Sequence, residues 1–454
     1  MFSQSSLSRS LALLVLLSAL LLTLPLLMGH RTAATLTTSG LVLLSGALLI
    51  ALIGYAIRPA TALRPPPRSW WVFSAILSAA VLLQVLPFEP LARSFGPYPD
   101  ALWQDGNGPG QWSPNPAATL RGWATFVALM VIAWSAGAIE PRQRNILWLV
   151  VAASALFQAL YGLVSHATSS ETIFGIWPRH NIDFVHGSFS NRNLFAGYLA
   201  LTWPLVISIW WRHSMPGMSK LPFEMRVAGS VISGAIIGAA LLASASRLGS
   251  AAGVAGMLVG LVLWTRFRAR LRPVAMWPLY LTAFGALVAA TWYGLTPLAE
   301  RLAVTSIEES RLEVFALMIQ DLPAQWWQSG VGLGGFEAVF KQVQPGDMGG
   351  WYDYAHNDLL QWLLEMGLVG AGLLLAVLIG LWRNARLNRE TIPLYAGLTA
   401  LALVGLGDFS WHIPATQVVL ALFLGTLLQR GGARPLFHDQ SQLADPHSDL
   451  PATS

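Results

Sequence analysis

Cysteine is absent from the 454-residue sequence, and charged residues are scarce. The missing cysteines exclude disulfides, thiolate metal ligands and cysteine nucleophiles. Charged residues make up 11% of the chain and hydrophobic residues 54%, whereas roughly 25% of a soluble domain is charged. Mean hydropathy is +0.55. Too few polar residues are present to cover a soluble surface of this size, so we expect an all-α polytopic membrane protein.

The net charge of +5 does not indicate nucleic-acid binding. The basic residues lie in short loops between apolar segments, where they set membrane topology. A spanning helix needs about 20 mostly apolar residues. By that criterion we predict about 12 transmembrane helices, at 10–29, 34–56, 69–87, 118–139, 145–166, 191–211, 227–245, 249–265, 274–295, 358–382, 392–408 and 414–430. The first segment lacks a clear cleavage site, so we expect it to be retained.

The distribution of Lys and Arg predicts the orientation of these helices. With a cytoplasmic N-terminus, 18 of the 27 Lys and Arg residues lie in inside segments and 9 lie outside. This bias predicts that both termini are cytoplasmic. Residues 1–186 then form N-terminal membrane helices, and 187–430 form a second membrane region with a large outside loop, 296–357, between the ninth and tenth spans. The polar tail 431–454 is expected to be disordered.

The large outside loop carries two local patterns. Apolar residues recur over 312–322 after Arg311, which predicts an amphipathic helix on the membrane surface or packed over the bundle. The stretch Gly330-Val331-Gly332-Leu333-Gly334-Gly335-Phe336 resembles a phosphate-binding loop only superficially, because the required strand and helix are absent. We expect a close-packed turn there.

Polar residues gather at the outside ends of several spans. His356, Asn357 and Asp358 open the tenth span, where polar groups are costly and usually retained for a function. The turn before the twelfth span carries Asp408, Trp411 and His412. Four of the arginines predicted to lie outside belong to this group of polar residues, although basic residues are rarer on that side: Arg192, Arg247, Arg301 and Arg311.

Arginines and a histidine at a lipid surface favour one chemistry. Arginine binds phosphate bidentately and stays charged. Histidine accepts a proton from a hydroxyl near neutral pH. A diphosphate-linked lipid presents its phosphates at this depth, and the sequence lacks the clustered carboxylates that would hold a divalent ion. The pattern therefore predicts glycosyl transfer without a metal or cofactor, with His356 as the base.

Each of these residues also has a structural interpretation. Arg247 can snorkel to the interface, and Arg192 lies beside a helix start that Asn191 can cap. His356 can neighbour a helix cap. Arg301 can instead form an ion pair with Glu300 or Glu308. Arg311 can form one with Glu308 or Glu309. Three further histidines are interpreted as ordinary loop residues, namely His180, His186 and His412.

Glu365 is expected to support the fold and to lie outside the site itself. On a helix it is about half a turn from His356 in azimuth and about 13 Å along the axis. A buried polar contact between helices is the better interpretation, with Gly367, Gly370 and Gly372 allowing close packing.

The motifs of the central and C-terminal parts, roughly 185–425, resemble the O-antigen ligase and polymerase superfamily of bacterial envelopes. The resemblance rests on Gly187-Ser188-Phe189-Ser190-Asn191-Arg192-Asn193, on Ser246-Arg247-Leu248-Gly249, and on Arg311 followed by the glycine-rich turn. Its most specific part is Ala355-His356-Asn357-Asp358-Leu359-Leu360-Gln361 with Glu365-Met366-Gly367. Residues before 180 carry little beyond hydropathy.

The resemblance implies a GT-C-like membrane fold that acts at the periplasmic face of the bacterial inner membrane. The donor is a glycan on undecaprenyl diphosphate, and no nucleotide sugar is used. A ligase transfers it, with inversion, to a lipid A-core sugar, whereas a polymerase transfers it to a second lipid-linked repeat unit. His356 corresponds to the family's essential histidine, and Arg247 and Arg311, then Arg192 or Arg301, correspond to its diphosphate-binding arginines.

We expect a ligase, with a polymerase of O-antigen or exopolysaccharide repeats as the alternative. A transporter or flippase is a third hypothesis, because twelve spans suit that architecture. Against it, no two matching halves are detectable, and the polar residues gather at one face instead of the midplane.

Overall fold

The computed structural model describes residues 4–27, 42–43, 45–47, 49, 68–98, 109–139, 141–179, 182–212, 220–267 and 306–428. Its first helices are α1 (Gln4–Leu26), α3 (Arg68–Val85), α4 (Glu89–Phe95), α5 (Pro116–Ala138) and α6 (Pro141–Ala167). A two-stranded antiparallel hairpin follows, made of β1 (Thr172–Ile173) and β2 (Trp177–Pro178). The next helices are α7 (Arg192–Ile209), α8 (Phe223–Ala243) and α9 (Arg247–Phe267). The last part contains α12 (Ser306–Asp321), α13 (Ala324–Ser329), α14 (Phe336–Phe340), α15 (Asp358–Arg383), α16 (Ile392–Val404), the 3-10 helix η5 (Ser410–His412) and α17 (Pro414–Leu428).

Six of the described helices are long and apolar enough to cross a membrane, namely α3, α5, α6, α8, α9 and α15. Shorter apolar helices are part of α1, α16 and α17. These helices are those of a polytopic membrane protein. The predicted spans 34–56 and 274–295 lie mostly or wholly outside the described residues, and each other predicted span overlaps a described helix. The total of about 12 spans, the GT-C-like arrangement and the disordered tail stay predictions.

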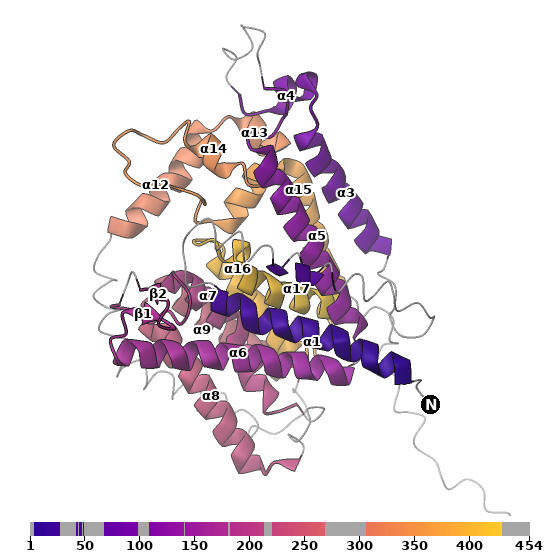
Figure 1. The fold of residues 1–454 in the computed structure, drawn as a ribbon, viewed down its shortest axis with the longest axis vertical. Coiled ribbons are helices and arrows are strands. Elements are labelled where there is room, and N and C mark those ends of the chain that lie inside the picture. Colours follow the sequence, from indigo (N-terminus) through magenta and orange to yellow (C-terminus); the bar gives the residue numbers. More distant parts are fainter. Residues whose placement is uncertain are drawn as a thin grey trace, which may run out of the picture.

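Helix α7 packs against four other helices, α6, α8, α9 and α16 (Figure 1). Nearly all its residues from Leu194 to Ile209 are buried. A helix that is apolar on every side is expected to be enclosed by other helices. Asn191 caps its start, as predicted, by accepting a hydrogen bond from the Asn193 N–H at 2.7 Å. The polar start of α7 therefore has a fixed place relative to its neighbours.

The described part of the large loop, from α12 to the start of α15, contains its own small core. Helices α12, α13 and α14 lie near the start of α15 (Figure 1). Val314 and Met318 of α12 are buried in one cluster with Phe336 and Phe340 of α14, whereas Leu312 is exposed. The predicted amphipathic helix is therefore confirmed, and its apolar face packs over the loop's core.

The tenth predicted span is not one continuous helix. Helix α15 is interrupted at Gly367, where φ is 57° and ψ is −146°. The glycine-rich turn docks at the interruption, because the Val331 N–H donates to the Leu364 carbonyl at 2.9 Å and the Gly332 N–H donates to the Glu365 carbonyl at 3.0 Å. Gly367 therefore packs closely against the end of another helix, as expected, since a Cβ added to it would meet the backbone of Gln328 and Ser329 in α13.

Positive φ angles confirm the close-packed turn predicted at this point. Gly330, Gly332 and Gly334 have φ angles of 80°, 100° and 71°. A Cβ added to Gly330 would lie 2.7 Å from the Glu365 carbonyl oxygen, so the two backbones touch. Only glycine combines that approach with a left-handed conformation at little cost.

Candidate active site

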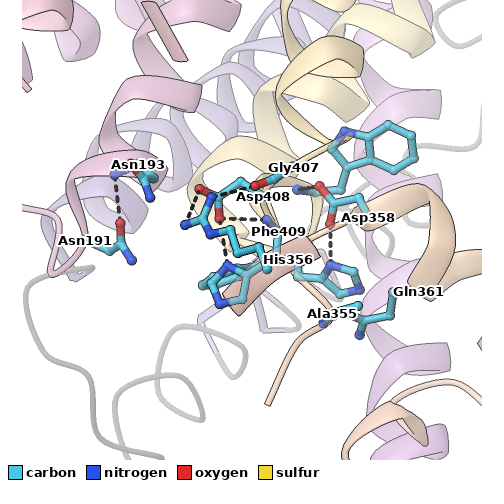
Figure 2. Close-up of polar contacts among 12 residues, drawn as sticks. Asn191, Asn193, Ala355, His356, Asp358, Gln361, Gly407, Asp408 and Phe409 are labelled. Carbon is cyan, nitrogen blue, oxygen red and sulfur yellow. Dashed lines mark hydrogen bonds and ion pairs between the residues drawn. The ribbon is translucent and has the colours of Figure 1, made fainter. Parts of the chain in front are cut away.

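The polar start of α15 is tied to the turn between α16 and α17. Asn357 is the N-cap, and its Oδ1 accepts a hydrogen bond from the Leu360 N–H at 3.0 Å. Its Nδ2 donates to the Leu406 carbonyl at 2.9 Å. The Asp358 N–H donates to the Gly405 carbonyl at 2.7 Å. These bonds hold His356 next to residues that lie far along the chain (Figure 2).

Asp408 in this turn lies between two of the predicted site residues. Its side chain is 4% exposed, and its Oδ1 is 3.6 Å from His356 Nδ1. Its Oδ2 is 3.7 Å from Arg311 Nη2. The Arg311 Nη1 also donates to the Gly407 carbonyl at 2.7 Å. One buried carboxylate therefore brings together the cation of α12 and the imidazole before α15.

His356 is held in an unusual backbone conformation. Its φ is +53°, in the left-handed region, which costs about 1–3 kcal/mol for a non-glycine residue. Its ring contacts the Phe409 ring edge-on, with centroids 4.9 Å apart. The side chain remains 22% exposed. Because Nδ1 faces Asp408, Nε2 is the nitrogen available to a ligand.

A second His–Asp pair lies beside the first. His412 Nδ1 is 2.7 Å from Asp358 Oδ1, and the Asp358 side chain is fully buried. Asp358 Oδ2 also accepts a hydrogen bond from the Trp411 N–H at 2.9 Å. Tyr354 stacks on Phe409 with centroids 4.5 Å apart. The ring of Tyr354 therefore separates the two pairs, together with Phe409.

Burial and neighbouring charges shift the pKa values of His412 and Tyr354. Burial disfavours a charged His412 ring, but the hydrogen bond and the negative charge of Asp358, with that of Glu365, outweigh burial and raise the pKa of His412 above its usual value. Burial, aided by nearby carboxylates, raises the pKa of Tyr354 to about 12. At neutral pH, Tyr354 is therefore a neutral ring, and the His412–Asp358 contact favours the imidazolium.

The raised pKa of His412 predicts a pH-dependent stability. A pKa that is higher in the folded state than its usual value of about 6.5 stabilises the fold below that value, and the contribution is lost as pH rises through the folded pKa. Thermal unfolding of the purified protein in detergent, measured between about pH 6 and about pH 9, should show a midpoint that falls with pH more steeply than in His412→Gln. His166, whose Nδ1 lies 3.1 Å from the Ile182 carbonyl, offers a control as His166→Gln. Equal pH slopes in the wild type and His412→Gln would refute this role.

Arg247 is the first residue of α9 and lies at the same end of the bundle. The next residue, Leu248, approaches Gly407, since a Cβ added to Gly407 would lie 2.8 Å from Leu248 Cδ2. Gly249 packs closely against Ala196 of α7. The start of α9 therefore borders the turn that Arg311 contacts.

Of the two remaining candidate arginines, the structure describes Arg192 but not Arg301. The guanidinium of Arg192 lies 4.2 Å from the centroid of the Phe184 ring, over its face. Figure 2 shows Asn191 and Asn193, on either side of Arg192, near Asp408. Arg301 lies outside the described residues. The alternative partners of Arg311, Glu308 and Glu309, have side chains outside the described part of the chain, and the described partner is Asp408.

Two histidines interpreted as ordinary loop residues make specific structural contacts. His412 pairs with a buried carboxylate. His186 is buried, and its Nε2 accepts a hydrogen bond from Arg179 Nε at 3.1 Å. Arg179 also donates to the Ser165 carbonyl at 3.0 Å, which ties the β hairpin to the end of α6. The structural interpretation stays a prediction for both; His180 lies outside the described residues.

The sequence assigns no role to Asp408 or Gln361, yet both contact the His356 segment. Asp408 faces His356 directly, and Gln361 Oε1 accepts a hydrogen bond from the Ala355 N–H at 3.0 Å. A lone carboxylate between two apolar runs is the signal that points to Asp408. Within the described ranges, no group of three or more His, Asp and Glu residues is arranged to hold a metal ion.

The middle of the chain matches a known protein family. Residues 232–375 match the family model described as O-antigen ligase. The matched part contains Arg247, Arg311, His356 and Glu365, and it ends before Asp408. A search of curated proteins found no match.

Proposed function

We propose, because residues 232–375 match the O-antigen ligase family and support the O-antigen ligase/polymerase superfamily, that the chain transfers a glycan from undecaprenyl diphosphate to a hydroxyl of the lipid A-core. The family implies a membrane glycosyltransferase-like enzyme that acts on lipid-linked glycans. We place the reaction at the periplasmic face of the inner membrane, with both termini in the cytoplasm. In this proposal residues 187–430 form the catalytic membrane region, and the helices before 187 support it.

The observation that carries the proposal is the arrangement of Arg311, Asp408 and His356. A base and a phosphate-binding cation are required within reach of one reacting centre. The contacts of both side chains with the Asp408 carboxylate, at 3.6 and 3.7 Å, support that requirement. Arg247, at the start of α9 beside Gly407, is the second proposed cation.

His356 acts as the general base in this mechanism. The acceptor oxygen forms a bond to the anomeric carbon while that carbon's bond to the diphosphate oxygen breaks. The hydroxyl proton passes to His356 Nε2, because Nδ1 faces Asp408. The buried Asp408 carboxylate favours the imidazolium that results, much as a carboxylate orients and stabilises the histidine of a catalytic triad. A single displacement of this kind inverts the anomeric centre.

The arginines stabilise the leaving group. Charge accumulates on the diphosphate as its bond to the sugar breaks, and fixed cations stabilise this charge more in the transition state than in the ground state. Arg311 is fixed by Gly407 and Asp408, so its orientation is set before the donor arrives. Its remaining N–H groups are the proposed diphosphate donors, with Arg247 as their partner and with Arg192 and Arg301 as further candidates.

An assay with two competing acceptors tests the function. Purified protein in detergent is mixed with a lipid-linked glycan and with equal amounts of lipid A-core and a second lipid-linked repeat, and products are identified by mass spectrometry. We expect glycan on the lipid A-core. Elongated lipid-linked glycan alone would identify a polymerase instead. Absence of transfer to either acceptor by folded protein would contradict the enzyme, and transfer without membrane compartments excludes transport as its sole function.

A further inference from the structure

Glu365 is buried in the site's supporting layer, and the proposed chemistry leaves it without a role. Its side chain is 2% exposed. Its Oε1 accepts hydrogen bonds from Gln361 Nε2 at 3.0 Å and from the Phe336 N–H at 3.4 Å. It therefore contacts both its own helix and the start of α14, next to the glycine-rich turn.

Gln361 extends this contact to the residue before His356. Its Nε2 donates to Glu365. Its Oε1 accepts from the Ala355 N–H at 3.0 Å, and Figure 2 shows Gln361 beside Ala355. An amide has one accepting and one donating end. Glu365 Oε1 already accepts from the Phe336 N–H, so it presents an acceptor to Gln361 and selects the orientation in which the Gln361 oxygen faces Ala355. With the amide reversed, two donors would face each other at Ala355.

The backbone at His356 requires such support. Its φ of +53° is strained for a non-glycine residue and persists only where the surroundings impose it. Asn357 fixes the chain after His356 through its cap and its bond to Leu406. Ala355, fixed by Gln361, holds the chain before it. The two anchors together aim the imidazole at Asp408.

The interruption of α15 brings Glu365 to its place. The helix breaks at Gly367, two residues later, and the carbonyls of Leu364 and Glu365 accept bonds from the glycine-rich turn. The same docking puts the Phe336 N–H within reach of the Glu365 carboxylate. Seating of the large loop is thereby linked to the backbone of His356.

We propose that Glu365 is a positioning residue, which acts through Gln361 and Ala355 to hold His356 in the conformation that faces Asp408. The inference rests on the proposed function of His356 as the base. It predicts that a change at Glu365 alters the turnover step more than the binding of the donor, because the diphosphate-binding arginines lie on other elements.

The test compares Glu365→Leu, Gln361→Leu and the double variant in the transfer assay. Leucine removes the accepting oxygen at 365, which a glutamine would retain. Misplacing a catalytic group by about 1 Å lowers the rate by roughly 100-fold. We expect kcat of each single variant to fall by about tenfold to 100-fold, with KM for the donor nearly unchanged. The double variant should match the single ones, because residues that act through one another are not additive. Additive losses, or an unchanged kcat in Glu365→Leu, would overturn the proposal.

Gln84→Leu is the matched control for damage to the fold. Gln84 is also buried, and its Nε2 donates to the backbone carbonyl of the same Glu365 at 3.2 Å, so its hydrogen bond bypasses the Glu365 side chain and Gln361. This variant should lose thermal stability and keep its kcat. An equal loss of kcat in Gln84→Leu would mean that any damage near the break in α15 lowers turnover. That result would refute the positioning role of Glu365.

A readout independent of turnover separates this inference from the function of His356. Modification of His356 by diethyl pyrocarbonate, followed by peptide mass spectrometry, reports the accessibility of its ring. We expect the modification rate to change severalfold in Glu365→Leu and to stay unchanged in Gln84→Leu. A changed modification rate with unchanged transfer would support the positioning contact and refute His356 as the base; an unchanged modification rate would refute the positioning contact itself.

Discussion

His356→Ala is expected to lower glycan transfer by roughly 100-fold to 10,000-fold, the range over which a positioned general base contributes. The variant removes the imidazole that faces Asp408 and leaves the cap and the hydrogen bonds of Asn357 in place. Expression, membrane insertion and the thermal unfolding midpoint should therefore remain close to those of the wild type. The measurement is the initial rate of transfer to the lipid A-core by purified protein, normalised to the folded fraction.

The control for this substitution is His166→Ala, which removes a histidine that contacts a loop carbonyl instead of a carboxylate. It should leave the transfer rate within about twofold of the wild type, as expected for a surface residue remote from the chemistry. Wild-type activity in His356→Ala would show that another group accepts the proton.

Arg311→Ala is expected to produce the second large effect, a fall of roughly 100-fold to 1,000-fold in kcat/KM, comparable to the loss of a transition-state hydrogen-bond donor. The guanidinium contributes the proposed diphosphate contact and also faces the buried Asp408. Its removal should therefore weaken donor binding and slow the leaving of the diphosphate. Arg311→Lys should recover only part of the activity, because a lysine presents a point charge and cannot hold Gly407 and a phosphate with one planar group.

Lys341 provides the charge control. It lies in the same large loop, is 42% exposed, and pairs with the exposed Glu337 at 2.7 Å. Lys341→Ala changes the net charge by the same amount as Arg311→Ala and should leave kcat/KM nearly unchanged, because exposed ion pairs contribute little. Equal losses in the two variants would indicate that only the charge of the loop matters. Full recovery by Arg311→Lys would contradict the bidentate role of Arg311.

Local patterns explain why much of the helical framework is predictable. Apolar length predicts where most of the described helices lie, because a spanning helix needs a continuous apolar run. The cap residues Asn191 and Asn357 are readable because a side-chain acceptor precedes each helix. The period of apolar residues after Arg311 likewise predicts α12. Each of these signals is contained within a few turns of chain.

Contacts between distant segments are harder to predict. Asp408 carries no periodic signal, and its pairing with Arg311 and His356 depends on how the turn after α16 meets α12 and α15. The break in α15 at Gly367 cannot be predicted from the sequence either, because the apolar run continues on both sides of it. It forms because the glycine-rich turn supplies hydrogen bonds to the carbonyls of Leu364 and Glu365. In both cases the decisive partner comes from another segment of the chain.

In the proposed mechanism His356 acts in the transfer step and the arginines bind the donor. The most direct measurement is made on one preparation of His356→Ala in detergent, in which equilibrium binding of the undecaprenyl-diphosphate-linked glycan and its transfer to the lipid A-core are both determined. We expect donor affinity within about threefold of the wild type and transfer reduced at least about 100-fold. Transfer at the wild-type rate, or loss of donor binding equal to the loss of transfer, would contradict it.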